Sequence, residues 1–229
     1  MIGIIVAMEK EMQALSIENA RTQKVGSITF TLGTVAGHAV VAAVCGIGKV
    51  FAAMCAQTMI LQYAPRLLIN CGVAGSLTDA LDVLDIAIGR AAVQYDMDTT
   101  PIGDPPGLIS GLDLVELPCD ASLSLKLLQA ARNLGLRTEI GLLATGDRFC
   151  ASKADKDRIL QNFPQGIACE MEGGAVAQIC AANGVPCCLF RAISDTADGK
   201  APMAYDAFAV EAAKNAGKLM TAFLENLPM

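Results

Sequence analysis

The chain has 229 residues, of which 53% are hydrophobic, and its 17 basic and 23 acidic side chains give a net charge of −6. Its basic residues are scattered singly, so no basic stripe is present to meet phosphates, which argues against nucleic-acid binding. The apolar opening of eight residues is too short for a signal peptide or a membrane span. We expect a cytoplasmic protein with one domain over residues 1–229, because no linker-like stretch interrupts the chain.

Short apolar runs alternate with longer helical patterns along the chain. In chain order, the predicted elements are a strand at 2–8, strands at 27–32 and 39–45, a helix at 49–64, strands at 66–72 and 84–96, a helix at 121–135, a strand at 138–147, a helix at 152–163, a strand at 166–171, a helix at 172–184, a strand at 185–195 and a helix at 205–227. The strands are uniformly apolar, as in a sheet covered on both faces. This order predicts an α/β fold with a largely central sheet.

The nine cysteines and the single histidine do not suggest a metal centre. The cysteines lie mostly in apolar runs and include no C-x-x-C pair, so we expect buried, reduced thiols and no zinc site. His38 follows a glycine turn and begins a predicted strand. The chemistry of this protein should therefore proceed without histidine.

Several acidic side chains follow the carboxyl ends of the predicted strands, where α/β sheets bind ligands. These strand exits carry Met8, Glu9 and Glu11, then Asp147, Arg148 and Phe149, then Glu170, Met171 and Glu172, then Ser194 and Asp195. Each acid also has a structural interpretation. Glu172 could serve the first turn of a helix, and Glu9, Lys10 and Glu11 could form a solvated helix start. Asp147 could belong to a turn, and Asp195 could be an N-cap or turn residue.

Arg191 lies within the apolar run "CCLFRAISD", which should be buried. A buried guanidinium needs an anionic partner to offset the loss of its hydration. The partner could be a carboxylate such as Glu11, or a bound anion or polar substrate. Glu170 has no chemical role that the sequence indicates, and we expect it to be structural.

Taken together, several segments resemble the purine nucleoside phosphorylase superfamily, and within it the 5′-methylthioadenosine/S-adenosylhomocysteine nucleosidases. The markers are "IGIIVAMEKEM", "CGIGKVFAA", "INCGVAGSL", "ATGDRF", "FPQGIACEMEGGAVAQIC", "VPCCLFRAISD" and "YDAF". The resemblance spans nearly the whole chain. It implies a three-layer αβα sandwich with a central mixed sheet, usually a homodimer, that needs no metal or cofactor.

The resemblance also implies a role for each matching residue. Asp195 matches the general acid that protonates the purine, Glu172 the carboxylate that grips the ribose hydroxyls, and Glu11 the group that activates the attacking water. The remaining matches bind substrate: Ser194 beside the acid, Met171 under the sugar, Phe149 and the backbone of Cys150 at the adenine, Arg191 beside Glu11, and Met8, Ile47 and Tyr205 around the 5′-alkylthio group.

Two segments depart from the family pattern. Val73 stands where many members carry serine, in the turn that helps to bind the water or, in phosphorylases, the phosphate. The loss of this hydroxyl argues further against phosphate binding. In residues 95–113 the usual histidine and aromatic residue are missing, and Thr99 and Ile102 stand at the expected contact positions across a dimer interface.

The implied activity is hydrolysis of methylthioadenosine and adenosylhomocysteine to adenine and the thioribose product. Neutral adenine is a far better leaving group than its anion, so a carboxylic acid held near the base can assist the reaction by supplying a proton. Nearby carboxylates stabilise the cation-like sugar. The alternatives are a phosphorylase or hydrolase of another 5′-modified purine nucleoside, such as aminofutalosine, and a nucleoside-binding protein without activity on the same fold.

Overall fold

The computed structural model describes residues 1–197 and 201–228. Within them the strands are β1 (Ile2–Val6), β2 (Glu18–Val25), β3 (Ile28–Val35), β4 (His38–Val44), β5 (Leu68–Ser76), β6 (Ile86–Gln94), β7 (Leu117–Pro118), β8 (Thr138–Thr145), β9 (Gly166–Glu170) and β10 (Cys187–Asp195). The helices are α1 (Glu9–Met12), α2 (Lys49–Tyr63), the 3-10 turn η1 (Thr100–Ile102), α3 (Ala121–Asn133), α4 (Lys153–Asn162), α5 (Gly173–Asn183) and α6 (Ala201–Glu225).

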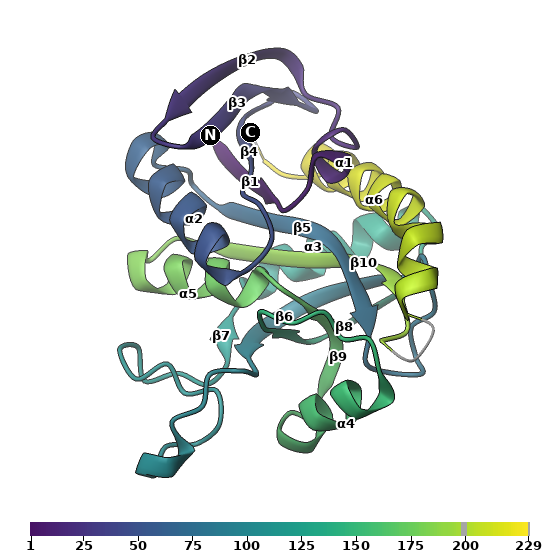
Figure 1. Cartoon of the computed structure of the whole chain (residues 1–229). Coiled ribbons are helices and arrows are strands. Elements are labelled where there is room, and N and C mark those ends of the chain that lie inside the picture. The colour runs from purple at the N-terminus through teal and green to yellow at the C-terminus, as the bar shows by residue number, and fades with distance from the viewer. Residues whose placement is uncertain (198–200, 229) are drawn as a thin grey trace.

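The strands form one mixed sheet, with the order β10-β6-β8-β9-β5-β1-β4-β3-β2 and with β7 beside β6 (Figure 1). Strand β10 pairs with β6 in antiparallel orientation and also with β5 in parallel orientation. The five strands β10, β6, β8, β9 and β5 therefore close into a ring, and β1, β4, β3 and β2 extend from β5. This closure brings the ends of β5, β9 and β10 together.

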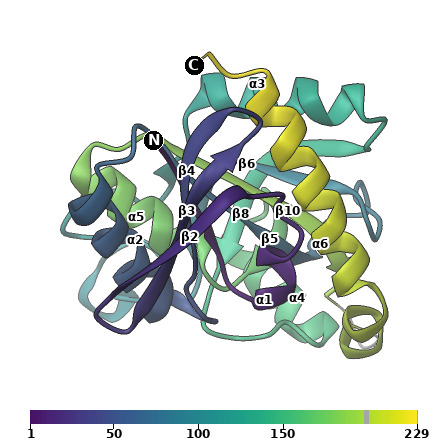
Figure 2. The same ribbon diagram turned by 90° about the horizontal axis from the view of Figure 1, so that it is seen from above.

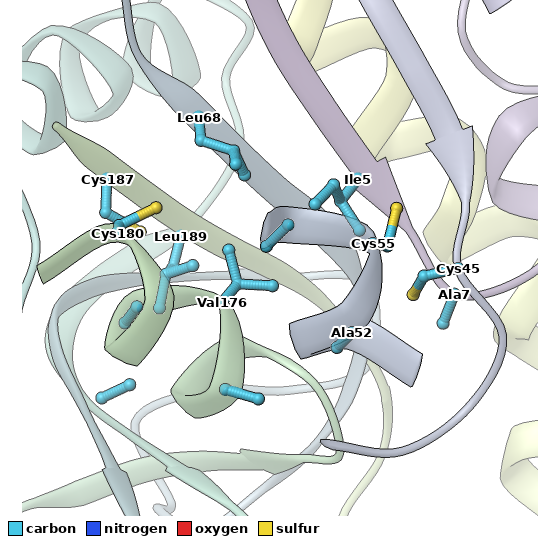
Figure 3. Packing of buried hydrophobic residues seen from close by; sticks show 14 of the residues in the cluster. Ile5, Ala7, Cys45, Ala52, Cys55, Leu68, Val176, Cys180, Cys187 and Leu189 are labelled. Carbon is cyan, nitrogen blue, oxygen red and sulfur yellow. The ribbon is translucent and has the colours of Figure 1, made fainter. Parts of the chain in front are cut away.

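Helices cover the sheet on both sides (Figure 2). Helices α2 and α5 pack on one face, where Ala52 and Val176 meet the strand residues Ile5, Leu68 and Leu189 (Figure 3). Helices α3 and α6 pack on the other face through a second buried cluster that includes Leu127, Leu219 and Phe223. The predicted three-layer αβα sandwich with a central mixed sheet is therefore confirmed.

The apolar strands and helices lie close to where the sequence pattern predicts them. Ser152 caps α4 as expected, because its hydroxyl accepts a hydrogen bond from the N–H of Asp155. His38 begins β4 and is buried. No helix in the two described stretches has the length and apolar character that a membrane crossing requires.

Strand β2 was not predicted, because its sequence, ENARTQKV, is polar and almost entirely exposed. It forms at the sheet edge, where it pairs only with β3 and needs no apolar face. Its charged side chains suit an unpaired edge, since they discourage pairing with another chain. Helix α6 also begins earlier than predicted, at Ala201.

Candidate active site

One cavity of about 390 Å³ lies where the strand ends of the ring converge. It is lined by Met8, Glu11, Ile47, Val73, Phe149, Cys150, Met171, Glu172, Ser194, Asp195 and Tyr205, which are all of the site residues predicted from the sequence except Arg191. Ala7, Ala74, Gly75, Arg148, Cys169 and Glu170 complete the lining.

The carboxylate of Glu11 is held against the turn between β1 and α1. The backbone N–H groups of Ala7 and Met8 donate to its Oε2 at 2.9 Å each, and the N–H of Val73 donates to Oε1 at 3.1 Å. Burial raises the pKa of Glu11, although Arg191 and these three N–H groups oppose the rise. The side chain is therefore fixed in orientation and retains its proton to a higher pH than an exposed glutamate.

Glu172 stands at the N-cap position of α5 and reaches across to the loop that precedes α2. Its Oε1 accepts a hydrogen bond of 2.8 Å from the N–H of Gly48. Burial and the neighbouring charge of Glu170 raise the pKa of Glu172 to about 7, against the opposing effect of Arg191. Asp147 accepts from the next N–H along the chain, that of Lys49 at the start of α2, at 2.8 Å. Its structural role is therefore a contact with a distant helix rather than with its own turn.

Asp195 ends β10 and is 2% exposed. The hydroxyl of Ser194 donates to its Oδ2 at 2.9 Å, and the N–H of Ala197 donates to Oδ1 at 2.9 Å. On the adjacent strand β5 the residue opposite is Gly75, which has no side chain to fill the space that the carboxylate occupies. These contacts fix both oxygens of Asp195 at the edge of the cavity.

The three acids reach the cavity from different elements. Glu11 lies in α1, Glu172 directly precedes α5, and Asp195 ends β10. Glu11 stands beside Gly72 of β5, and Asp195 stands beside Gly75 of the same strand, three residues further along. A ligand that fills the cavity would therefore meet Glu11 and Asp195 at two different points.

Arg191 differs from the prediction. It does not line the cavity, and its ion-pair partner is Glu170 rather than Glu11 or a bound anion. Both side chains of this pair are 1% exposed. The guanidinium also donates to Oδ1 of Asn70, to the carbonyl of Asn70 at 3.0 Å and to the carbonyl of Phe190 at 2.9 Å. Arg191 therefore lies beneath the cavity and ties β10 to β5 and β9.

Glu170 has the structural role that we expected for it, and it supports the site. Its Oε2 accepts from the N–H groups of Glu172 at 2.9 Å and Gly173 at 2.6 Å, and its Oε1 accepts from the hydroxyl of Thr145. Burial alone would raise the pKa of Glu170, but Arg191 and these donors hold it below its usual value. The charged Glu170 therefore caps the start of α5 and positions Glu172.

The cavity also has an apolar and aromatic wall, which includes Met8, Phe149 and Tyr205. The rings of Phe149 and Tyr205 meet edge to face, with centroids 5.6 Å apart. The Tyr205 hydroxyl donates to the sulfur of Met8 at 3.1 Å and accepts from the ammonium of Lys10 at 2.9 Å. Lys10, considered a solvated residue from the sequence, thus contacts the site.

Cys169 lines the cavity and was not predicted as a site residue. Its thiol donates to the carbonyl of Gly75 at 3.6 Å. Its interaction with the thiol of Cys150 lowers the pKa of Cys150 and raises that of Cys169. A signal for Cys169 was present in the sequence. It directly precedes the predicted strand exit Glu170, Met171 and Glu172, and all four residues line the cavity.

The chain matches proteins of a known family along almost its whole length. A family model described as the phosphorylase superfamily matches residues 1–225. The chain belongs to the phosphorylase superfamily. One relative of this chain is a 5′-methylthioadenosine/S-adenosylhomocysteine nucleosidase of Shewanella halifaxensis. The two sequences are 37% identical over 229 residues, and the match covers 99% of each chain.

Solved structures give the same result for this member of the phosphorylase superfamily. The nucleosidase of that name from Neisseria meningitidis, in complex with methylthio-immucillin-A, is 35% identical with a TM-score of 0.95 and 99% coverage of both chains. The native futalosine hydrolase of Helicobacter pylori is 31% identical, with a TM-score of 0.92 and coverage of 99% of this chain and 97% of that one. These matches confirm the family resemblance predicted from the sequence.

Proposed function

We propose that this protein hydrolyses the N-ribosidic bond of 5′-methylthioadenosine and S-adenosylhomocysteine, releasing adenine and the 5-thioribose product. The observation that carries the proposal is that Glu11, Glu172 and Asp195 line one cavity, with an apolar and aromatic wall beside them. The names of the relatives from Shewanella and Neisseria, which match along the full chain, support the same substrates.

Asp195 acts at the purine. It protonates the departing adenine, so that the base leaves as a neutral molecule, an effect of about 10²–10⁴-fold for general acid catalysis. The hydrogen bonds from Ser194 and Ala197 orient its carboxyl group. Phe149 stacks on the base, and the backbone of Cys150 reads its edge.

Glu172 and Glu11 act at the sugar. The Glu172 carboxylate accepts hydrogen bonds from the ribose hydroxyls and stabilises the positive charge that develops on the sugar as the bond breaks. Glu11, held by three backbone N–H groups, orients the attacking water and takes its proton. Met171 packs beneath the ribose, and Met8, Ile47 and Tyr205 surround the 5′-alkylthio group.

A second candidate substrate is another 5′-modified adenine nucleoside, such as aminofutalosine. The similarity to the futalosine hydrolase of Helicobacter pylori favours it. A phosphorolytic reaction is less well supported, because Val73 presents no hydroxyl to the cavity beside Glu11. A protein that only binds nucleosides would not require three carboxyl groups in one cavity.

We also propose that the protein is a cytoplasmic homodimer. Helix α2 exposes an apolar surface formed by Val50, Phe51, Met54 and Leu61, and Ile102 of η1 is exposed as well. A second copy of the chain would remove this surface from water. Sedimentation velocity, which separates dimer from monomer, tests the proposal, and a monomer at micromolar concentration would contradict it.

The activity is tested by incubating the protein with methylthioadenosine, adenosylhomocysteine, aminofutalosine, adenosine and inosine, with and without phosphate. We expect free adenine and the free thio-sugar from the first two substrates, at rates that do not depend on phosphate. A rate that rises from zero only when phosphate is added would show that the reaction is phosphorolysis. Tight calorimetric binding without adenine release would favour the binding protein.

A further inference from the structure

Lys10 lies directly behind the apolar wall of the cavity. Its Nζ donates to the Tyr205 hydroxyl at 2.9 Å and stands 4.3 Å from the centre of the Tyr205 ring. That hydroxyl in turn contacts the sulfur of Met8, and both Tyr205 and Met8 line the cavity. A positive charge is therefore present at the part of the cavity that we assign to the 5′ substituent.

The other cations beside the cavity already have acidic partners. Arg148 pairs with Asp155 at 2.8 Å, and Arg191 pairs with Glu170. Within the described part of the chain, the contacts of Lys10 are a neutral hydroxyl and an aromatic ring. An ammonium group has three donors, so after the bond to Tyr205 two remain for a ligand.

An anionic ligand group would be repelled in the interior of the cavity and attracted at the position of Lys10. Glu11 and Glu172 line the interior, and in their ionised forms they repel a carboxylate there. Lys10 offers attraction at the 5′ end instead. Lys10 does not line the cavity itself. A short neutral substituent such as methylthio would therefore end against the apolar wall, and a carboxylate would reach the ammonium only on a chain long enough to extend past Met8 and Tyr205.

We propose that Lys10 is a specificity residue that binds the carboxylate at the end of a long 5′-thio substituent. This inference rests on the proposed function and names the substrate class that the site favours. These are 5′-thioadenosines with a carboxylate-bearing chain, of which adenosylhomocysteine is one, in preference to those with a short alkyl group. Lys10 does not take part in bond cleavage.

Substrates that differ only in the charge of the 5′ chain test the proposal. The set comprises adenosylhomocysteine, an analogue whose chain ends in a carboxylate without an ammonium, an analogue whose chain ends in an ammonium without a carboxylate, and methylthioadenosine. The variants are Lys10→Met, Lys10→Arg and, as a control for net charge, Lys218→Met, which alters an exposed lysine on α6.

For Lys10→Met we expect kcat/KM to fall about fivefold to tenfold for both carboxylate substrates, through KM and with kcat unchanged. The value for methylthioadenosine should stay within about twofold. The same substitution should raise kcat/KM for the analogue that ends in an ammonium, because it removes a repelling positive charge. Lys10→Arg should retain the preference for carboxylates, and Lys218→Met should match the wild type.

An equal loss on methylthioadenosine and adenosylhomocysteine would show that Lys10 only supports Tyr205, and no loss on any substrate would show that it has no role. Either result would overturn the proposal. Calorimetric titration of the same four nucleosides with the wild type and Lys10→Met tests it independently of turnover. If no adenine is released from any substrate, the proposed function fails, while the binding difference still decides the role of Lys10.

Discussion

The carboxylate of Asp195 occupies the space that a side chain on Gly75 would fill. The two residues pair across β10 and β5, and a Cβ atom at position 75 would lie 2.8 Å from Oδ1 of Asp195. The same relationship recurs three residues earlier on β5, where a Cβ at Gly72 would lie 2.6 Å from Oε1 of Glu11. Strand β5 thus leaves room for an acid at each of two points of the cavity.

Gly75→Ala should therefore impair turnover by displacing Asp195. We expect kcat to fall about 100-fold or more, since a misplaced general acid loses most of its effect, while binding of adenine nucleosides persists. Initial-rate kinetics and calorimetry measure the two effects. Gly111→Ala is the matched control, because a Cβ there meets nothing within 4 Å. Turnover by Gly75→Ala equal to that of Gly111→Ala would show that the position of Asp195 is not critical.

Asp195→Asn should keep the fold and part of the affinity but lose most turnover. The amide oxygen can keep only one of the two hydrogen bonds that Ser194 and Ala197 donate to the two carboxylate oxygens, and the amide cannot deliver a proton to the purine. We expect a fall of about 10²–10⁴-fold in kcat. Adenine release under substrate saturation measures it, and wild-type turnover would remove Asp195 from its assigned role.

The raised pKa of Glu172 predicts a pH dependence of both activity and stability. Glu172 must be ionised to accept hydrogen bonds from the ribose hydroxyls and to stabilise the positive sugar. The value of kcat/KM should therefore rise with pH up to about 7, the pKa of this group. The folded state binds the Glu172 proton more tightly than the unfolded state, whose value is near 4.5. Glu172 should therefore lower the free energy of unfolding progressively as the pH rises from about 4.5 to about 7.

Glu172→Gln separates this effect from those of other groups. The difference in unfolding free energy between wild type and variant should shift in favour of the variant across that pH range and level off above it. Denaturant unfolding at several pH values measures it. A difference that stays constant from pH 4 to 8 would contradict the raised pKa.

Glu170→Gln should destabilise the protein by about 3–5 kcal/mol, because it leaves the buried guanidinium of Arg191 without an anionic partner. It should also lower activity, since Glu170 positions the backbone of Glu172. Glu116→Gln breaks the exposed pair with Arg90 and should cost less than about 1 kcal/mol. Urea unfolding compares the two. Equal effects would mean that the buried pair contributes no more than the surface pair.

The apolar strands predicted an α/β fold with a central sheet, and the residues at their carboxyl ends predicted part of the cavity lining, including Glu11, Glu172 and Asp195. The three layers and other lining residues, such as Ile47 and Tyr205, were predicted from the family resemblance. It did not predict the partner of Arg191. Glu170 and Asn70 reach that side chain only because β9 and β10 both pair with β5, and sequence order does not reveal this ring. The contact between Lys10 and Tyr205 was missed for a similar reason, since it joins residues 195 positions apart.

Strand β10 is buried at every one of its nine positions, and it carries both Arg191 and Asp195. Ile47 and Phe149, by contrast, are 56% and 43% exposed where they border the cavity. Substitutions at Ile47 or Phe149 can therefore change the border of the cavity one residue at a time. A substitution in β10 would instead disturb packing, the Arg191 ion pair and the position of Asp195 together. We therefore expect substrate selectivity to change most readily through Ile47 and Phe149. Directed evolution for altered selectivity should target these residues and leave β10 unchanged.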